Sequence, residues 1–163
     1  MSIITLDSLP NTVEELKRLP QSLLTDPNAT AALTVAALHR YPQSTEDTFA
    51  MLDFLRGPRA LTESDKQFIK ERFTGKEYIM RSYFLGAAPE NNYTPQKPYR
   101  VEVTENSSSR SELGYINLFV TCSGADSPRP VKVRHKQSTD QWFLWDQALL
   151  TGIKKPKEED VWA

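Results

Sequence analysis

The stretch Pro27-Asn-Ala-Thr-Ala-Ala-Leu-Thr-Val-Ala-Ala-Leu-His-Arg-Tyr41 decides the fold of this chain. In helical geometry its apolar residues leave almost no polar side, because they fall on three sides of the helix: Ala31, Val35 and Leu38, then Ala32 and Ala36, then Leu33 and Ala37. A helix at a protein surface shows a single apolar stripe instead. We therefore expect residues 27–41 to form a central helix that the rest of the chain covers.

The composition is typical of one globular domain spanning residues 1–163. Hydrophobic residues make up 39% of the 163 residues and charged residues 25%, which is enough to bury a core without disulfides or metal ions. Lys and Arg number 20 against 21 Asp and Glu, so the formal net charge is -1. Because this balance creates no overall attraction for anionic partners, we expect neither nucleic acid nor a membrane as a partner, while a local basic patch stays open.

Cysteine content and apolar runs bear on the compartment and on site chemistry. Cys122 is the only cysteine, so the chain can form no intramolecular disulfide and lacks the ligands of a cysteine-based zinc site. The first residues show no basic region followed by a long apolar run, and no segment approaches the roughly 18 apolar residues of a membrane span. We predict a cytoplasmic protein with no metal site and no cofactor.

The first half of the chain, about residues 11–85, is predicted to be helical. Capping residues mark four helix starts: Asn11 or Thr12, Asp26 before Pro27, Ser44, and Thr62. Proline or glycine follows each expected helix, at Pro20, Pro42, Gly57 and Gly75. Residues 1–10 are expected to form only a short extended lead-in.

The second half, about residues 98–147, changes to the alternating pattern of strands. Four runs show it, near Tyr99–Val103, Tyr115–Cys122, Val131–Arg134 and Trp142–Trp145. Their connections are too short for parallel crossovers. The fold class is therefore predicted to be α+β, with N-terminal helices packed on a C-terminal four-stranded antiparallel meander sheet, followed by an extended tail over residues 154–163.

The irregular connection that precedes the strands is the first place to look for a binding site, since long loops in compact domains are often functional. It offers guanidinium, phenol and amide groups suited to small-molecule or peptide recognition: Arg81, Tyr83, Asn91, Asn92 and Tyr93. An alternative is that the asparagine side chains only pin the loop to its own backbone. The residues alone do not separate these two interpretations.

Aromatic and basic residues of the strands add further candidates. Trp142 and Trp145 fall on opposite faces of one strand, so one ring belongs to the core and the other covers a sheet face or lines a groove. Arg129, with Lys132, Arg134 and Lys136, follows a turn whose amides suit an anion. We favour a simpler explanation for this basic run, namely protection of an edge strand. We retain Trp145 and Arg129 as ligand-binding candidates, and Trp162 near the C-terminus as a partner-binding one.

The two histidines are the acid–base candidates, because hydrolase and phosphate-loop motifs are absent. His39 lies near the end of the central helix, where the helix dipole is expected to raise its pKa. Packing or capping is the favoured role for it. His135 is expected on the solvent face of its strand. No catalytic residue is assigned.

Several stretches together resemble a family of small uncharacterised bacterial proteins from clostridia-like gut organisms. They are Phe54-Leu-Arg-Gly-Pro-Arg59, Pro89-Glu-Asn-Asn-Tyr-Thr-Pro95, Ser123-Gly-Ala-Asp-Ser-Pro-Arg-Pro130, Gln141-Trp-Phe-Leu-Trp145 and the closing Lys-Pro-Lys-Glu-Glu-Asp-Val-Trp-Ala. The resemblance covers essentially the whole chain. It implies a stand-alone domain and transfers no activity and no catalytic residue.

Together these observations favour a non-catalytic module that binds a small molecule or a protein. Its expected site is a concave surface between helix and sheet, lined by residues 81–95 and one tryptophan. Self-association is left open. The alternative is a small enzyme with a cone-like pocket of the nuclear-transport-factor type and His39 as acid–base, which rests on analogy of fold alone.

Overall fold

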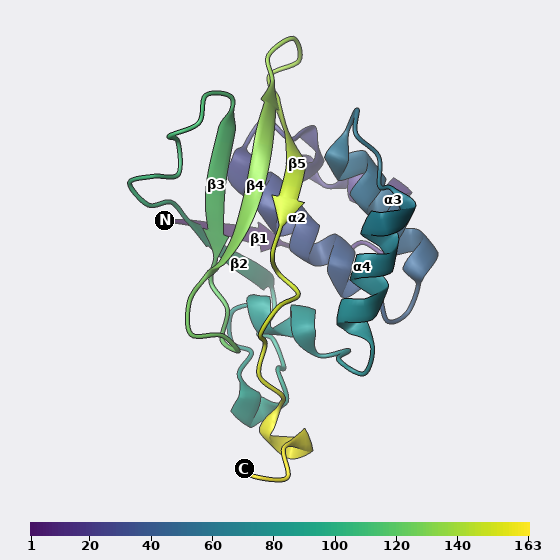
Figure 1. Ribbon diagram of the computed structural model, residues 1–163, viewed down its shortest axis with the longest axis vertical. Coiled ribbons are helices and arrows are strands. Elements are labelled where there is room, and N and C mark those ends of the chain that lie inside the picture. Colours follow the sequence, from purple (N-terminus) through teal and green to yellow (C-terminus); the bar gives the residue numbers. More distant parts are fainter.

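Helix α2 (Pro27–His39) lies against a five-stranded antiparallel sheet in the computed structural model, which describes all of residues 1–163 (Figure 1). The strands neighbour one another in chain order: β1 (Ser2–Leu6), β2 (Tyr99–Thr104), β3 (Tyr115–Val120), β4 (Arg129–Lys136) and β5 (Gln141–Gln147). The α+β class is confirmed. The expected meander is present as β2 to β5.

Helix α2 is buried on every side, as its sequence predicts. The Asp26 carboxylate accepts a hydrogen bond from the Asn28 amide and caps the helix start, and every residue from 29 to 38 is buried. The helix contacts all five strands and also α3. Its buried hydroxyls are satisfied, because Thr30 donates to the Trp142 carbonyl at 2.7 Å and Thr34 to the Thr30 carbonyl.

The sheet has five strands, so the prediction of four was wrong. The missing strand is β1, which pairs antiparallel with β2 from Ser2↔Val103 to Leu6↔Tyr99. It comes from the segment that was expected to be a lead-in, and it places a strand ahead of the helices. Leu6 is completely buried, so the pairing gives this apolar side chain a place in the core.

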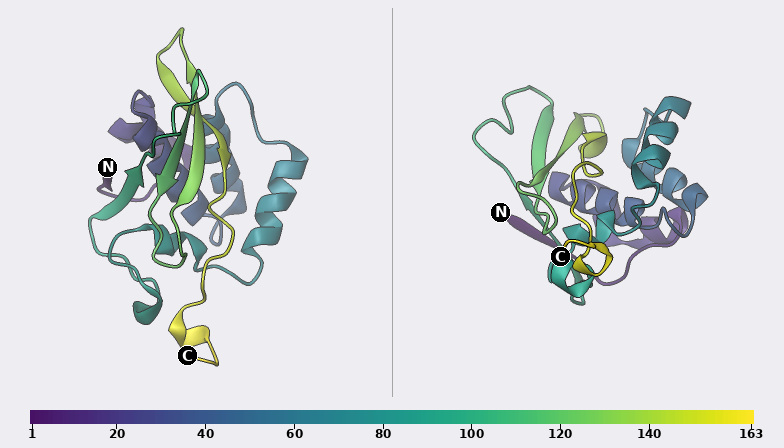
Figure 2. Two further views of the ribbon diagram at one scale, coloured as in Figure 1. Left: turned by 60° about the vertical axis from the view of Figure 1, so that its left-hand side comes forward. Right: turned by 60° about the horizontal axis from the view of Figure 1, so that its bottom comes forward.

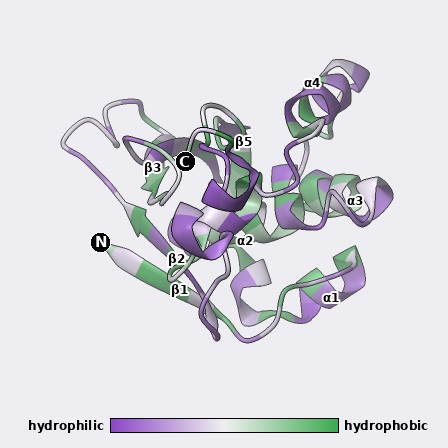
Figure 3. Ribbon diagram, turned by 90° about the horizontal axis from the view of Figure 1, so that it is seen from below, coloured by the Kyte–Doolittle hydropathy of each residue, from purple (hydrophilic) through white to green (hydrophobic).

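The remaining helices begin where the caps predict. They are α1 (Val13–Arg18), α3 (Thr45–Arg56) and α4 (Glu63–Phe73), with short 3₁₀ helices η1 (Pro20–Leu23), η2 (Ile79–Tyr83), η3 (Pro89–Asn91) and η4 (Lys157–Glu159). Side chains of Thr12, Ser44 and Thr62 each accept a hydrogen bond from a first-turn amide. Helices α1, α3 and α4 lie on one flank of α2 (Figure 3). The tail, expected to be extended, contains η4.

The two faces of the sheet differ in character. Valine and leucine side chains cover the inner face that meets α2, and those of β2 to β5 are all buried: Val101, Val103, Ile116, Leu118, Val120, Val131, Val133 and Leu144. The outer face carries half-buried or exposed polar and aromatic residues. Helices cover only one side of the sheet, and α3 and α4 stand beside the β5 edge (Figure 2).

Strand β4 is an interior strand, which corrects the interpretation of its basic residues. It pairs with β3 on one side and with β5 on the other. Its lysines and arginines therefore do not protect a sheet edge. The edge strands are β1 and β5, and the outward backbone groups of β5 at Trp142 are bonded to Leu24 and Thr30.

Shortening one buried side chain of the central helix tests how fully the helix is enclosed. Leu33 is completely buried, so we expect Leu33→Ala to lower the free energy of unfolding by about 2–5 kcal/mol through lost burial and the cavity left behind. Urea unfolding followed by circular dichroism measures it. Leu113→Ala is the matched control, since Leu113 is 98% exposed, and a similar loss in both variants would contradict the enclosure of α2.

Candidate functional site

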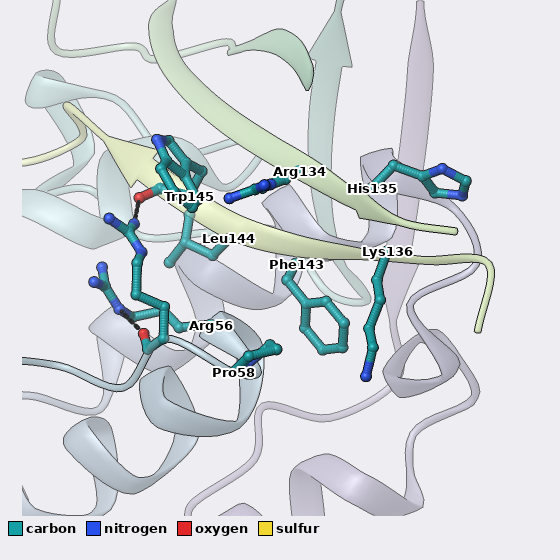
Figure 4. Close-up of a pocket in the computed structure, with 9 residues that line it drawn as sticks. Arg56, Pro58, Arg134, His135, Lys136, Phe143, Leu144 and Trp145 are labelled. Atoms are coloured by element: carbon teal, nitrogen blue, oxygen red, sulfur yellow. Dashed lines mark hydrogen bonds between the residues drawn. The ribbon is translucent and has the colours of Figure 1, made fainter. Parts of the chain in front are cut away.

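A groove of about 380 Å³ lies where the turn between α3 and α4 meets β4 and β5 (Figure 4). Its volume is in the range of small-molecule sites. The nine lining residues are mostly cationic or apolar: Arg56, Pro58, Arg59, Arg134, His135, Lys136, Phe143, Leu144 and Trp145. No aspartate or glutamate lines the groove.

The α3–α4 turn reaches the sheet because its first residue is glycine. Gly57 has φ of +62°, and a Cβ at this position would lie 2.5 Å from the Phe143 ring. A side chain would therefore push the turn away from β5. The turn is also fixed within itself, since Arg56 Nε donates to the Arg59 carbonyl at 2.9 Å.

Arg59 closes one end of the groove against Trp145. Its guanidinium lies over the indole ring at 3.8 Å from the ring centroid, and it also donates to the Trp145 carbonyl. That carbonyl is free of the ladder because the β4–β5 pairing passes from Val133↔Leu144 to Lys132↔Asp146 and skips Trp145. Such an extra residue re-aims a side chain and interrupts pairing.

Trp145 also holds the second cation of the groove. The Arg134 guanidinium lies 4.8 Å from the indole centroid, and the Tyr115 ring meets the indole edge-on at 5.4 Å. Stacking on aromatic rings fixes a guanidinium plane and leaves its edge N–H groups free to donate. The indole thus orders Arg59 and Arg134 in the same part of the groove.

The charges of the groove are only partly balanced. Arg56 is paired with Asp65 at 3.4 Å, whereas Arg59, Arg134 and Lys136 form no ion pair. Burial, followed by the nearby charge of Arg56, lowers the pKa of Arg59, and the charges of Asp65 and Asp146 outside the groove lining offset this only in part. Crowded like charges are relieved by an anion, so the groove is suited to bind one.

The two tryptophans lie on opposite faces of β5, as predicted. Trp142 packs against the core and stacks on His135 with ring centroids 4.5 Å apart. His135 therefore shares the face of the valines and is not on the expected solvent face of β4. Its ring binds Asp140 at 2.8 Å and points away from the groove in Figure 4.

Four of the five candidates from the irregular connection use their side chains in hydrogen bonds within the chain, and Asn92 is exposed and contributes only its backbone carbonyl. Tyr83 and Tyr93 are buried, and their hydroxyls donate to the carbonyls of Leu149 and Lys154. Arg81 donates to the carbonyls of Asn92 and Tyr93. The Asn91 side chain bonds to backbone groups of Gly86, Ala88 and Thr94. None of these residues lines the groove that contains Trp145.

The remaining candidates lie apart from one another. Arg129 donates to the carbonyls of Thr151 and Gly152 and so holds the segment after β5. Trp162 is 92% exposed near the chain end. Among the predicted ligand-binding residues, only Trp145 belongs to the groove. Sequence reasoning did not assign ligand binding to five residues that line the groove: Arg56, Arg59, Arg134, Lys136 and Phe143. The basic run on β4 and the Arg-Gly-Pro-Arg turn were visible signals.

The pKa of His39 is shifted in the direction opposite to the one expected from the sequence. Its half-buried ring meets Phe84 edge-on at 5.6 Å. Burial is the main cause that lowers the pKa of His39, followed by the charges of Arg81 and Arg40. The predicted rise was wrong, because dehydration and two guanidinium groups outweigh the partial charge at the helix end.

The described chain shows no group of three or more His, Cys, Asp or Glu side chains that could hold a metal ion. None of its helices combines the length and apolar character needed to span a membrane.

A family model described as a domain of unknown function (DUF6935) matches residues 8–157. The chain belongs to this family. No curated protein and no solved structure matches the chain. Membership agrees with the resemblance to uncharacterised proteins seen in the sequence.

Gly57 and Gly75 both have positive φ, but only Gly57 lies close to another side chain. Gly75 has φ of +70° and open space around it, whereas Gly57 faces the Phe143 ring. We expect Gly75→Ala to lower the free energy of unfolding by about 1–2 kcal/mol. Gly57→Ala should cost about 1–3 kcal/mol more, because its Cβ overpacks against Phe143 and because its ψ of -121° lies outside the left-handed helical region. Urea denaturation of both variants measures the difference. Equal losses would show that the turn does not pack on Phe143.

The pH dependence of stability reports the state of His39. The pKa of His39 is lowered in the folded chain from its ordinary value of 6.5. Below about pH 6.5, His39 therefore binds a proton more readily in the unfolded chain than in the folded one. The free energy of unfolding should therefore fall as pH decreases below about 6.5. We expect His39→Gln to flatten this slope in urea titrations between pH 5 and pH 8 (about the range over which histidine titrates). An unchanged slope would contradict the assignment.

Proposed function

We propose that this protein is a non-catalytic binding module whose groove between the α3–α4 turn and strands β4 and β5 holds an anionic ligand. The observation that carries the proposal is the cluster of Arg59, Arg134 and Lys136, which form no ion pair around a groove lined by no carboxylate. Unbalanced cations held in a concave site are the usual basis for recognition of phosphate or carboxylate groups.

The position of Arg134 and Lys136 strengthens this proposal. Both lie on an interior strand, where protection of a sheet edge no longer explains them. They alternate along β4, so their side chains project on the same outer face. With the α3–α4 turn bringing Arg59 to the same groove, cations from two distant parts of the chain converge on one place.

The chemistry of the groove supports binding and offers little for catalysis. Arginine and lysine are ordered there, but no carboxylate lines the groove and the His135 ring points away from it. The catalytic alternative required His39 as an acid–base. Burial and then the charges of Arg81 and Arg40 disfavour the protonated form of His39 and lower its pKa. Helix α2 itself fills the inner face of the sheet.

A titration with tripolyphosphate tests the proposal, because this ligand supplies charge without an aromatic ring. We expect it to bind at low ionic strength and to change the fluorescence of Trp145. The double substitution Arg134→Gln with Lys136→Gln should weaken binding by about tenfold or more, since a hydrogen bond to a charged group contributes about 1.5–3 kcal/mol. Isothermal calorimetry gives the affinity independently.

The control is Arg18→Gln with Lys70→Gln, which removes the same charge from exposed positions on α1 and α4 outside the groove. This variant should bind as the wild type does. If tripolyphosphate fails to bind at low ionic strength, or if both double variants weaken binding equally, the groove is not the anion site.

A further inference from the structure

The outer face of strands β3, β4 and β5 carries aromatic and cationic side chains, as the groove does. Aromatic rings stand on β3 and β5, cations stand on β4 between them, and no helix covers this face (Figures 1 and 2). The residues are Tyr115 and Phe119, then Lys132, Arg134 and Lys136, then Phe143 and Trp145. The α3–α4 turn covers Phe143 at Gly57, but Tyr115, Phe119 and Trp145 are only half-buried. An outer sheet face in contact with water needs polar side chains and has no need of these three rings.

The register places rings and cations in rows. Tyr115 pairs with Arg134, and Arg134 pairs with Phe143, so these three residues form one line across the sheet. Strands in a sheet lie about 4.8 Å apart, and alternate residues along β4 repeat about every 6.8 Å. The cations of β4 are therefore spaced like successive phosphates of an extended single strand, with rings on both sides of them.

The rings and cations are already in contact with one another. Lys132 lies 4.7 Å and Arg134 lies 5.4 Å from the centroid of the Tyr115 ring. The exposed Glu112 carboxylate binds Lys132 at 2.7 Å, so Lys132 is not a free cation. Arg59, Arg134 and Lys136 form no ion pair.

Single-stranded nucleic acid is the anion that uses both parts of this surface. Proteins that bind it combine a cationic track for the backbone with aromatic side chains on which bases stack. A duplex keeps its bases inside the stack, where the rings of a sheet cannot reach them. An acidic peptide would use the cations and leave the rings without a role.

We propose that the uncovered face of strands β3 to β5 binds a short single-stranded nucleic acid, with successive phosphates on Arg59, Arg134 and Lys136 and neighbouring bases on the aromatic rings. This inference rests on the proposed function, because the groove supplies the phosphate site. The absence of an overall positive charge, a net of -1, is compatible with it because the cations are concentrated locally.

Fluorescence anisotropy with a labelled deoxythymidine 12-mer tests the inference on the full chain. With three unpaired cations engaged, log K should fall with log salt with a slope of about -2. The duplex of the same length should bind at least about tenfold more weakly, because only its backbone is available. Arg134→Gln should reduce the slope by about 0.7, and Arg18→Gln should leave it unchanged.

Tyr115 separates base stacking from charge. Its loss in Tyr115→Leu should weaken binding of the 12-mer by about fivefold to a hundredfold, and Tyr115→Phe should retain affinity because the ring is kept. Because the Tyr115 ring also contacts Arg134, tripolyphosphate affinity should fall less than 12-mer affinity in Tyr115→Leu, and it should stay the same in Tyr115→Phe. If Tyr115→Leu does not fold, the salt slope of Arg134→Gln and the preference for single strand over duplex still decide the question.

The outcomes separate this inference from the proposed function. If tripolyphosphate binds but the 12-mer binds no better than its duplex, or no better than a polyglutamate peptide of equal length, the nucleic-acid inference is overturned and the anion site stands. Unchanged affinity of a folded Tyr115→Leu variant overturns it as well. If neither tripolyphosphate nor the 12-mer binds, both proposals fall.

Discussion

The small side chains of α2 allow the strands and the neighbouring helices to pack close to its backbone. Ala31, Ala32, Ala36 and Ala37 are essentially inaccessible to solvent, and a helix surface made of methyl groups lets strands and helices come near its backbone. Because α2 contacts all five strands and α3, it aligns the sheet on one side and the flanking helices on the other. The groove exists because these two sets of elements meet at the β5 edge.

Local patterns were sufficient for most of the fold. Caps such as Asp26, Ser44 and Thr62 mark helix starts because a backbone amide needs an acceptor there, and alternation marks β2 to β5 because one face is buried. Strand β1 was not predicted. Its five residues carry the same alternation, but its partner β2 is far along the chain, and no local signal reveals which distant edge a short segment will join.

The site was harder to predict than the fold for a related reason. Trp145 was recognised from the alternation of β5, and Lys136 and Arg134 were seen as a basic run. Their meaning changed once β4 proved to be an interior strand. Arg56 and Arg59 could not be assigned, because only the packing of Gly57 on Phe143 brings their turn to the sheet. Conversely, the polar groups around Asn91 were conspicuous in sequence yet are bonded to backbone.

Helix α4 is attached to the domain by little apolar surface, since Ile69 and Phe73 are its only buried residues. Segments that bury so little open at a small fraction of the free energy of global unfolding. The α3–α4 turn adjoins this helix, but its own contacts hold it to the sheet, through Gly57 at Phe143 and Arg59 at Trp145. Local opening of α4 can therefore expose the outer side of the turn while Arg134 and Lys136 stay fixed on an interior strand.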